Sequence, residues 1–354
     1  MKQHFFWTTA CIIRETAQTV TIVFNTKGDD LVFKAGQFVN ITLPINGEKV
    51  TRSYSLSSAP EHSKHPAITV KAVEGGVMSN YIVSHAEEID VWEVEGPHGL
   101  FHLTEAIEQK PWIVLVAGGS GITPLYSILK HVLTTSAGNV LLVNSNKTEA
   151  DVIFADALAY MLQSFSHRLK IVQVFTQPGT YSTARWNEVV DGRISRIRLK
   201  KVIKQYTGDA YLDADYFACG PGGLLKLAEE VTEQLGIPST QFHKESFVPV
   251  TDESASKLPD SVMEVLLHHY DQTNLLEVAP GKTILETALE DHVPIQYSCK
   301  NGACGVCMAK LLSGDVYMRQ NYVLTGEQVN EGYILLCQSH PLNSHVTVET
   351  VAAI

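Results

Sequence analysis

The sequence predicts a multidomain chain with an antiparallel β-barrel, an α/β domain on a parallel sheet, and a compact α+β domain. The length of 354 residues suits two or three domains of ordinary size. Short apolar runs separated by Gly, Pro and Asn occupy the first third, and strands alternate with helices from Pro111 onward. A polar segment at 248–260, with two prolines, is typical of a linker. A last segment with its own strands follows it.

Residues 1–109 are expected to form the barrel. The N-terminal segment is interpreted as a first strand, and a short helix is expected to begin near Ser79. The further strands expected here are Thr19–Phe24, Phe38–Leu43, Ala67–Val73 and Val91–Val94.

Residues 110–247 are expected to form the α/β domain, because apolar strand-like runs alternate with helical periodicity. The expected strands are Trp112–Ala117, Val140–Asn144, Leu169–Phe175 and Asp215–Ala218. The expected helices are Pro124–Leu133, Val152–Phe165, Trp186–Gln205 and Gly223–Leu235. Residues 261–354 should form the last domain, with strands at Val262–His268 and Leu275–Val278 and a helix around Ile284–Asp291.

Composition excludes several classes of function. A net charge of −11 and a pI of about 5.7 argue against a nucleic-acid-binding protein, which needs a basic face. The apolar runs are too short to span a membrane. The N-terminus lacks a small-residue cleavage site, and Thr8 and Thr9 interrupt its apolar stretch. We therefore expect a cytoplasmic protein that binds neither nucleic acid nor membranes.

Four cysteines crowd the last quarter of the chain in the pattern C-x4-C-x2-C, followed after twenty-nine residues by a fourth: Cys299, Cys304, Cys307 and Cys337. This is the spacing of plant-type [2Fe–2S] ligands. Small residues such as Gly302 and Gly305 let the backbone approach a cluster and donate N–H bonds. A zinc site or buried free thiols are the alternatives, although zinc usually takes paired C-x2-C ligands.

Residues 261–354 resemble a plant-type ferredoxin domain, with its signature in YSCKNGACGVC and LLCQSHP. The resemblance implies a β-grasp fold that binds a [2Fe–2S] cluster through the four cysteines.

The segment Arg52-Ser53-Tyr54-Ser55 offers a guanidinium for a phosphate, a ring to stack on a flavin and a hydroxyl for its reactive edge. By itself it could equally be a strand with a solvent-facing Arg and Ser. Gly75–Asn80 follows, at the expected helix start, where free N–H groups suit a pyrophosphate. An ordinary Ser cap after a glycine turn is the alternative.

Together these two segments resemble the ferredoxin–NADP reductase superfamily. The resemblance implies that Arg52 binds a flavin phosphate, Tyr54 packs on the isoalloxazine and Ser55 lies near N5. The segment GGVMS is similar to cytochrome b5 reductase, an FAD enzyme, and differs from the FMN-containing phthalate dioxygenase reductase branch, so FAD is favoured. The expected flavin-binding residues are Arg52, Ser53, Tyr54, Ser55, Gly76, Val77, Met78 and Ser79.

Two glycine-rich turns predict the nucleotide site. Each ends an apolar strand, where glycine backbone and a helix N-terminus can hold a pyrophosphate. The first departs from G-x-G-x-x-G, so a plain strand–turn–helix remains its alternative. The expected nucleotide-binding residues are Gly118, Gly119, Gly121, Thr123, Pro124, Cys219, Gly220 and Pro221.

Both turns resemble those of the same superfamily, which implies that Cys219 lies beside the nicotinamide. A lone buried cysteine is the alternative reading of that residue. Glu245 and Phe247 resemble the end of the family's nucleotide domain and are expected near the flavin. With Ser55 and Cys219, Glu245 completes the predicted catalytic set. Lys147 could pair with a 2′-phosphate, whereas Asp151 would favour a free 2′-hydroxyl, so NADH and NADPH both stay open.

The order of the three modules resembles the reductase subunit of phenylacetyl-CoA epoxidase and related oxygenase reductases. The resemblance implies an oxidoreductase that passes electrons from NAD(P)H through FAD and a [2Fe–2S] cluster to a protein acceptor, an oxygenase component such as a di-iron enzyme. Alternatives are a reductase for a desaturase, a haem monooxygenase or a hybrid-cluster protein, a non-enzymatic redox sensor, and a zinc-stapled binding protein.

Overall fold

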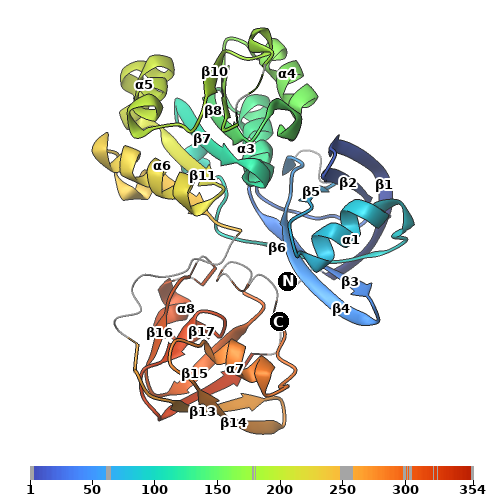
Figure 1. Cartoon of the computed structure of the whole chain (residues 1–354), viewed down its shortest axis with the longest axis vertical. Helices are drawn as coiled ribbons and strands as arrows, with labels where there is room; N and C mark the ends of the chain where they lie inside the picture. The colour runs from blue at the N-terminus through green and yellow to red at the C-terminus, as the bar shows by residue number, and fades with distance from the viewer. Residues whose placement is uncertain are drawn as a thin grey trace.

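A computed structural model describes residues 4–60, 65–177, 179, 181–247, 258–297, 300, 302, 305–321, 323–324 and 326–351. Two expected cluster ligands, Cys299 and Cys304, lie outside these residues, as do residues 248–257 of the expected linker. Figure 1 shows three bodies that follow one another along the chain, with the C-terminal one set apart from the other two. We call them the barrel domain, the parallel-sheet domain and the C-terminal domain.

The barrel domain is a six-stranded antiparallel sheet in the order β4-β3-β6-β1-β2-β5. An antiparallel bridge between Leu56 and Ile68 joins its two end strands, so the sheet curls into the predicted barrel. Trp7, Phe24 and Trp92 fill its centre. The elements are β1 His4–Thr16, β2 Thr19–Asn25, β3 Phe38–Ile45, β4 Glu48–Ser55, β5 Ala67–Lys71, α1 Val77–His85, η2 Ala86–Glu88, β6 Trp92–His98 and α2 Glu105–Glu108.

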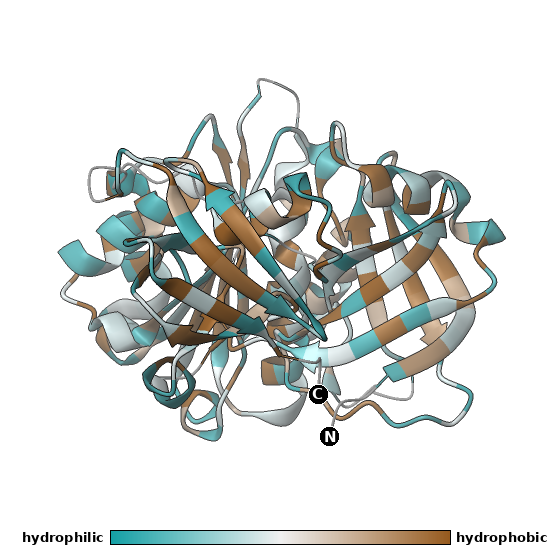
Figure 2. Ribbon diagram, turned by 90° about the horizontal axis from the view of Figure 1, so that it is seen from below, coloured by the Kyte–Doolittle hydropathy of each residue, from teal (hydrophilic) through white to brown (hydrophobic). Residues whose placement is uncertain are grey.

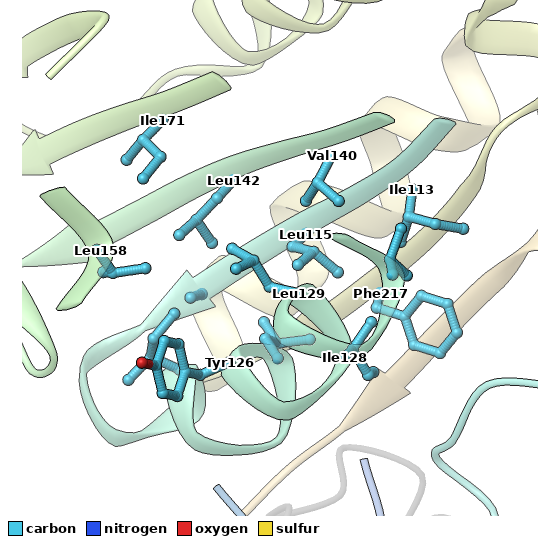
Figure 3. Packing of buried hydrophobic residues seen from close by; sticks show 14 of the residues in the cluster. Ile113, Leu115, Tyr126, Ile128, Leu129, Val140, Leu142, Leu158, Ile171 and Phe217 are labelled. Atoms are coloured by element: carbon cyan, nitrogen blue, oxygen red, sulfur yellow. The ribbon is translucent and has the colours of Figure 1, made fainter. Parts of the chain in front are cut away.

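The parallel-sheet domain has the strand order β10-β9-β8-β7-β11-β12, with every neighbouring pair parallel. Alternate side chains of the sheet pack on α3 and α4 on one face, as Figure 3 shows, and on α5 and α6 on the other. The strands are β7 Trp112–Gly118, β8 Asn139–Asn146, β9 Leu169–Phe175, β10 Glu188–Asp191, β11 Asp215–Cys219 and β12 Phe242–Glu245. The helices are η3 Gly119–Gly121, α3 Ile122–Thr135, η4 Glu149–Asp151, α4 Ala155–Ser164, η5 Thr183–Arg185, α5 Arg196–Thr207, η6 Gly208–Asp213, α6 Gly222–Gln234 and η7 Ser239–Gln241.

One predicted helix of this domain is wrong. The stretch Trp186–Gln205 begins instead with the edge strand β10, and only α5 is helical. Gly192, at φ +80°, turns the chain after the strand, and the Ser195 side chain caps the new helix by accepting the Arg198 N–H. β12, which sequence patterns also missed, adds the opposite edge.

The C-terminal domain has a five-stranded sheet in the order β14-β13-β19-β15-β17, in which only β13 and β19 run parallel. With α7 packed on the sheet, this is the predicted β-grasp arrangement. Figure 2 shows hydrophobic bands alternating with polar ones along the strands. The elements are β13 Met263–His269, β14 Gln272–Val278, α7 Ile284–Glu290, β15 Met308–Ser313, β16 Val316–Met318, α8 Gly326–Asn330, β17 Tyr333–Leu335, β18 Ser339–Pro341 and β19 Val346–Thr350.

Across the described residues, no helix is long and apolar enough to cross a membrane.

The barrel and parallel-sheet domains share a buried interface. The Glu15 carboxylate of β1 accepts hydrogen bonds from the Thr21 hydroxyl (2.7 Å) and from the backbone N–H of Phe154 (3.2 Å), just before α4. The Phe154 ring stacks on Tyr126 of α3 at 4.0 Å between centroids. Nearby, the Ser127 hydroxyl donates to the Ser58 carbonyl of the barrel at 2.5 Å. These contacts fix how one domain faces the other.

Burial raises the pKa of Glu15, and Asp156 adds to this effect, while the bonds from Thr21 and Phe154 and the charge of Lys130 oppose it. A carboxyl whose pKa is raised on folding stabilises the fold fully below its unfolded pKa, and this contribution is lost as the pH rises through the folded value. Glu15→Gln stays neutral, and its amide oxygen can still accept the Phe154 N–H. We therefore expect the variant to gain stability over the native protein as the pH rises from 5 to 8.

The measurement is the melting temperature of both proteins at pH 5 and pH 8. Glu87→Gln, which removes an exposed carboxylate, is the control. An equal difference between Glu15→Gln and the native protein at both pH values would contradict the assignment.

Candidate functional site

The site of the parallel-sheet domain lies where its strand order reverses. β8 and β11 flank β7 on opposite sides, and the helices that follow β7 and β11, α3 and α6, pack on opposite faces of the sheet. Ligands of open α/β sheets bind at this switch point, beyond the carboxyl ends of the strands. The two predicted glycine-rich turns begin here, after Gly118 and Cys219.

Three glycines allow these two turns to touch. A Cβ on Gly118 would lie 2.6 Å from the Pro221 ring, and one on Gly220 would lie 2.9 Å from the Gly118 nitrogen. A Cβ on Gly121 would strike the Cys219 carbonyl. Any side chain at these positions would force the turns apart. The sequence therefore needs glycine here for backbone packing, in addition to any ligand contact.

The turn after β7 offers backbone N–H groups, and one lysine of the barrel domain lies near it. The Thr123 hydroxyl donates to the Ser120 carbonyl at 3.0 Å, and Pro124 is buried, so these two side chains are turned to the protein and the backbone N–H groups of the turn are the candidates for binding a ligand. Gly119 has φ +54°, and a Cβ there would lie 3.9 Å from Nζ of Lys71, the last residue of β5. Sequence reasoning missed Lys71. Its only signal was a lysine near the end of a strand, four residues before Gly75-Gly76.

Cys219 and Glu245 lie side by side on the paired strands β11 and β12. Both are buried, and burial together with the Glu245 charge raises the pKa of the Cys219 thiol. The raised pKa keeps the Cys219 thiol protonated and uncharged. Phe247 follows two residues after β12, and 44% of it is exposed. Its expected contact with a flavin stays a prediction.

The predicted flavin motif occupies the end of β4. Arg52 is half-buried and donates to the Thr51 carbonyl at 2.7 Å, while the Ser53 hydroxyl donates to the Asn40 side chain at 2.8 Å. Burial raises the pKa of Tyr54 beyond its ordinary range, and Arg52 opposes this, so the phenol keeps its proton. Ser55 is buried and pairs with Phe38 of β3. A cation, a ring and a hydroxyl thus lie in sequence along one strand.

Helix α1 supplies the second part of the flavin motif. Gly76 is its N-cap residue, and a Cβ there would lie 2.6 Å from a Val73 methyl group. The Met78 side chain is buried in the barrel core, and the Ser79 hydroxyl accepts the Val73 N–H at 3.4 Å. For Met78, only the backbone N–H is left to meet a phosphate. Val77 is 53% exposed.

The two residues expected to select the nucleotide follow β8. Lys147 is exposed. Asp151 closes a capping box, because its carboxylate accepts the N–H (3.0 Å) and the hydroxyl (2.7 Å) of Thr148. Asp151 therefore shapes the turn as well as adding negative charge to it.

The two described cluster cysteines lie close together. Cys307 directly precedes β15 and Cys337 closely follows β17, and these strands pair antiparallel. The Leu336 N–H donates to the Cys307 carbonyl at 3.0 Å, and both cysteines are buried. Gly302 and Gly305, at φ +70° and +71°, shape the loop between the expected ligands. Two buried cysteines on neighbouring strand ends beside these glycines fit a [2Fe–2S] cluster.

Comparison with known families and proteins supports the same three parts. Residues 10–103 match an oxidoreductase FAD-binding domain, 115–230 an oxidoreductase NAD-binding domain, and 267–342 a 2Fe-2S iron-sulfur cluster binding domain. The chain therefore carries FAD, a nicotinamide nucleotide site and a [2Fe–2S] cluster.

Whole-chain relatives extend the match beyond single domains. The ferredoxin reductase component of 3-ketosteroid-9-alpha-monooxygenase from Rhodococcus rhodochrous is 31% identical, over 97% of this chain and 95% of the relative. One component of the 1,2-phenylacetyl-CoA epoxidase from Escherichia coli K12 is 30% identical, over 97% and 96%. The fold of phthalate dioxygenase reductase superposes with a TM-score of 0.59, at 22% identity over 98% of both chains.

Arg52→Ala should weaken FAD binding, because it removes a charged hydrogen-bond donor from the phosphate, which costs about 1.5–3 kcal/mol. Arg52→Lys should restore part of the affinity, since a point charge cannot replace the bidentate fork. The measurement is FAD affinity by fluorescence titration of the apoprotein. The control is Arg193→Ala, an arginine of the parallel-sheet domain in the turn after β10. Unchanged affinity in Arg52→Ala would show that Arg52 does not hold the phosphate.

Lys147→Gln should shift the ratio of kcat/KM values toward NADH, and Asp151→Asn should shift it toward NADPH. Asn retains an oxygen for the Thr148 bonds, so the turn survives while the charge is lost. A change of one accessible charge is expected to move the ratio about five- to thirty-fold. Steady-state reduction of ferricyanide with both nucleotides measures it, and Lys170→Gln, a change on β9, is the control. If neither ratio moves, the adenosine ribose binds elsewhere.

Proposed function

This chain belongs to the family of oxygenase reductases that join FAD, nicotinamide-nucleotide and [2Fe–2S] domains in one polypeptide, and on that premise we propose that it delivers electrons from NAD(P)H to an oxygenase component. The observation that carries the proposal is the match of the whole chain, from end to end, to components of two different oxygenase systems, one of them a ferredoxin reductase component.

The bound groups supply the electron chemistry: a nicotinamide gives two electrons as hydride, the flavin divides them, and the cluster passes them on singly. The protein supplies position. The glycine turns after β7 and β11 would hold the pyrophosphate by backbone N–H groups, with Lys71 adding a positive charge beside Gly119. Cys219 would pack against the nicotinamide as an uncharged group.

The flavin would lie along β4. We assign Arg52 and the N-terminus of α1 to its phosphates, Tyr54 to a stacking contact and Ser55 to a hydrogen bond at the reactive edge. Glu245 lies beside Cys219 and would bring a carboxyl group to the place where hydride is transferred. With these roles, the flavin would bind the barrel domain and the nucleotide the parallel-sheet domain, on either side of the interface to which the Glu15–Phe154 hydrogen bond contributes.

Electrons would leave through the C-terminal domain. Residues 261–354 contain ten Asp and Glu against four Lys and Arg, so this domain holds more than half of the chain's net charge of −11. Such a surface attracts a partner with a basic patch. We propose an oxygenase as that partner, with a phenylacetyl-CoA epoxidase-type di-iron enzyme as the specific candidate.

The test separates the flavin from the cluster. Native protein should contain FAD, two iron atoms and two sulfides per chain. Cys304→Ser should lose the cluster and abolish reduction of an oxygenase component, yet keep NAD(P)H-dependent ferricyanide reduction, because ferricyanide can take electrons from the flavin. Cys11→Ser, an exposed cysteine of the barrel, is the control and should change neither.

If the purified protein contained one zinc per chain and no sulfide, the assignment of a [2Fe–2S] cluster would be wrong. Loss of FAD from Cys304→Ser would contradict independent modules. A panel of oxygenase, desaturase and haem monooxygenase components then identifies the acceptor, and negligible turnover with every acceptor, ferricyanide included, would favour a redox sensor.

A further inference from the structure

Gln338 directs its side-chain nitrogen at three acceptors around the expected cluster. The residue follows Cys337 and is only 5% exposed. Its Nε2 lies 2.9 Å from the Lys300 carbonyl, 2.9 Å from the Cys337 carbonyl and 3.6 Å from the Cys337 sulfur. Because all three partners are acceptors, the amide nitrogen, and not its oxygen, must face them.

The backbone holds this side chain in place. The Gln338 N–H donates to the Leu335 carbonyl at 2.8 Å, and the Gln338 carbonyl accepts the Arg319 N–H at 2.8 Å. The backbone N–H and the backbone carbonyl of Gln338 are therefore both hydrogen-bonded. With the backbone held in this way, the side chain extends toward Lys300, whose carbonyl accepts its N–H.

The stem of Gln338 also packs against the cluster loop. Gly302 has φ +70°, and a Cβ there would lie 3.1 Å from Gln338 Cγ and 2.8 Å from the Gln320 carbonyl. Gly302 thus rests on the glutamine stem, while the Lys300 carbonyl accepts the amide N–H. Gln338 contacts the loop at Lys300 and Gly302 as well as the strand end at Cys337.

We propose that Gln338 is a positioning residue that raises the reduction potential of the [2Fe–2S] cluster by donating an N–H to the Cys337 sulfur. The amide has two N–H groups: one serves Lys300, and the other is shared between the carbonyl and the sulfur of Cys337. Reduction adds negative charge to the cluster and its thiolates. A donor to a thiolate sulfur stabilises this more negative state, and hydrogen bonds to sulfur are among the determinants of cluster potential.

The inference rests on the proposed role of Cys337 as a ligand, and the two can fail separately. Cys337→Ser tests the ligand through loss of the [2Fe–2S] spectrum. Gln338→Met tests the hydrogen bond, because methionine has a similar length and no donor. It should keep the spectrum and make cluster reduction about tenfold less favourable, which for a one-electron couple is a fall of about 59 mV.

The measurement is a redox titration of the full-length holoprotein followed by the EPR signal of the reduced cluster. Ser339→Ala is the matched control, because this neighbouring hydroxyl is buried and donates to the Leu335 carbonyl, away from the sulfur. The cluster of Ser339→Ala should have the reduction potential of the native protein. A Gln338→Met cluster that releases iron faster but titrates at the native potential would reduce Gln338 to a purely structural role and overturn the proposal.

A second measurement on the native protein tests the proposal even if Gln338→Met assembles no cluster. Native protein labelled with 15N in its glutamine side chains should show a nitrogen coupling in pulsed EPR of the reduced cluster. The coupling should persist in labelled Gln320→Met protein, which removes the other glutamine next to Gly302. Absence of the coupling from the native protein would equally overturn the proposal.

Discussion

The nucleotide site depends on the direct contact between two backbone turns. β7 and β11 pair in register up to Ala117 and Cys219, so the turns that follow leave the sheet side by side. The missing side chains of Gly118 and Gly220 let these turns meet. Each turn then starts a helix, α3 or α6, whose N-terminal N–H groups are not used within the helix. Two partial positive charges therefore converge where a pyrophosphate would lie.

The barrel domain can contribute Lys71 to that site only if the two domains keep one relative position. Lys71 extends from the end of β5 toward Gly119, and this reach exists because the interface with α3 and the start of α4 is fixed. Phe154 has φ +62°, a left-handed conformation uncommon for a bulky residue, and its N–H bonds to Glu15 while its ring stacks on Tyr126. Local strain is thus offset by contacts that align a flavin domain with a nucleotide domain.

Sequence patterns predicted the elements that carry long apolar runs and missed those decided by tertiary contacts. β9 was predicted at its observed bounds, because Leu169–Phe175 is a buried central strand. The helix predicted over Trp186–Gln205 failed at β10, a four-residue edge strand whose partner lies in β9, farther back in the sequence. The cysteine spacing predicted the cluster ligands. The contacts of Gln338 could not be predicted, because the sequence shows only that this residue follows Cys337. Lys71 likewise could not be predicted, because it lies near Gly119 only through the contact between two domains.

An acidic chain that binds anionic groups must create positive potential locally. The overall charge of −11 opposes a pyrophosphate, a flavin phosphate and a thiolate-bound cluster alike. Fixed dipoles act over short distances and need no net charge: helix starts serve the phosphates, and the Gln338 amide serves the Cys337 sulfur. Because screening limits distant surface charge to about 8–10 Å, these near donors outweigh the distant carboxylates. The acidic surface stays available for a protein partner, while each cofactor site is governed by the groups that touch it.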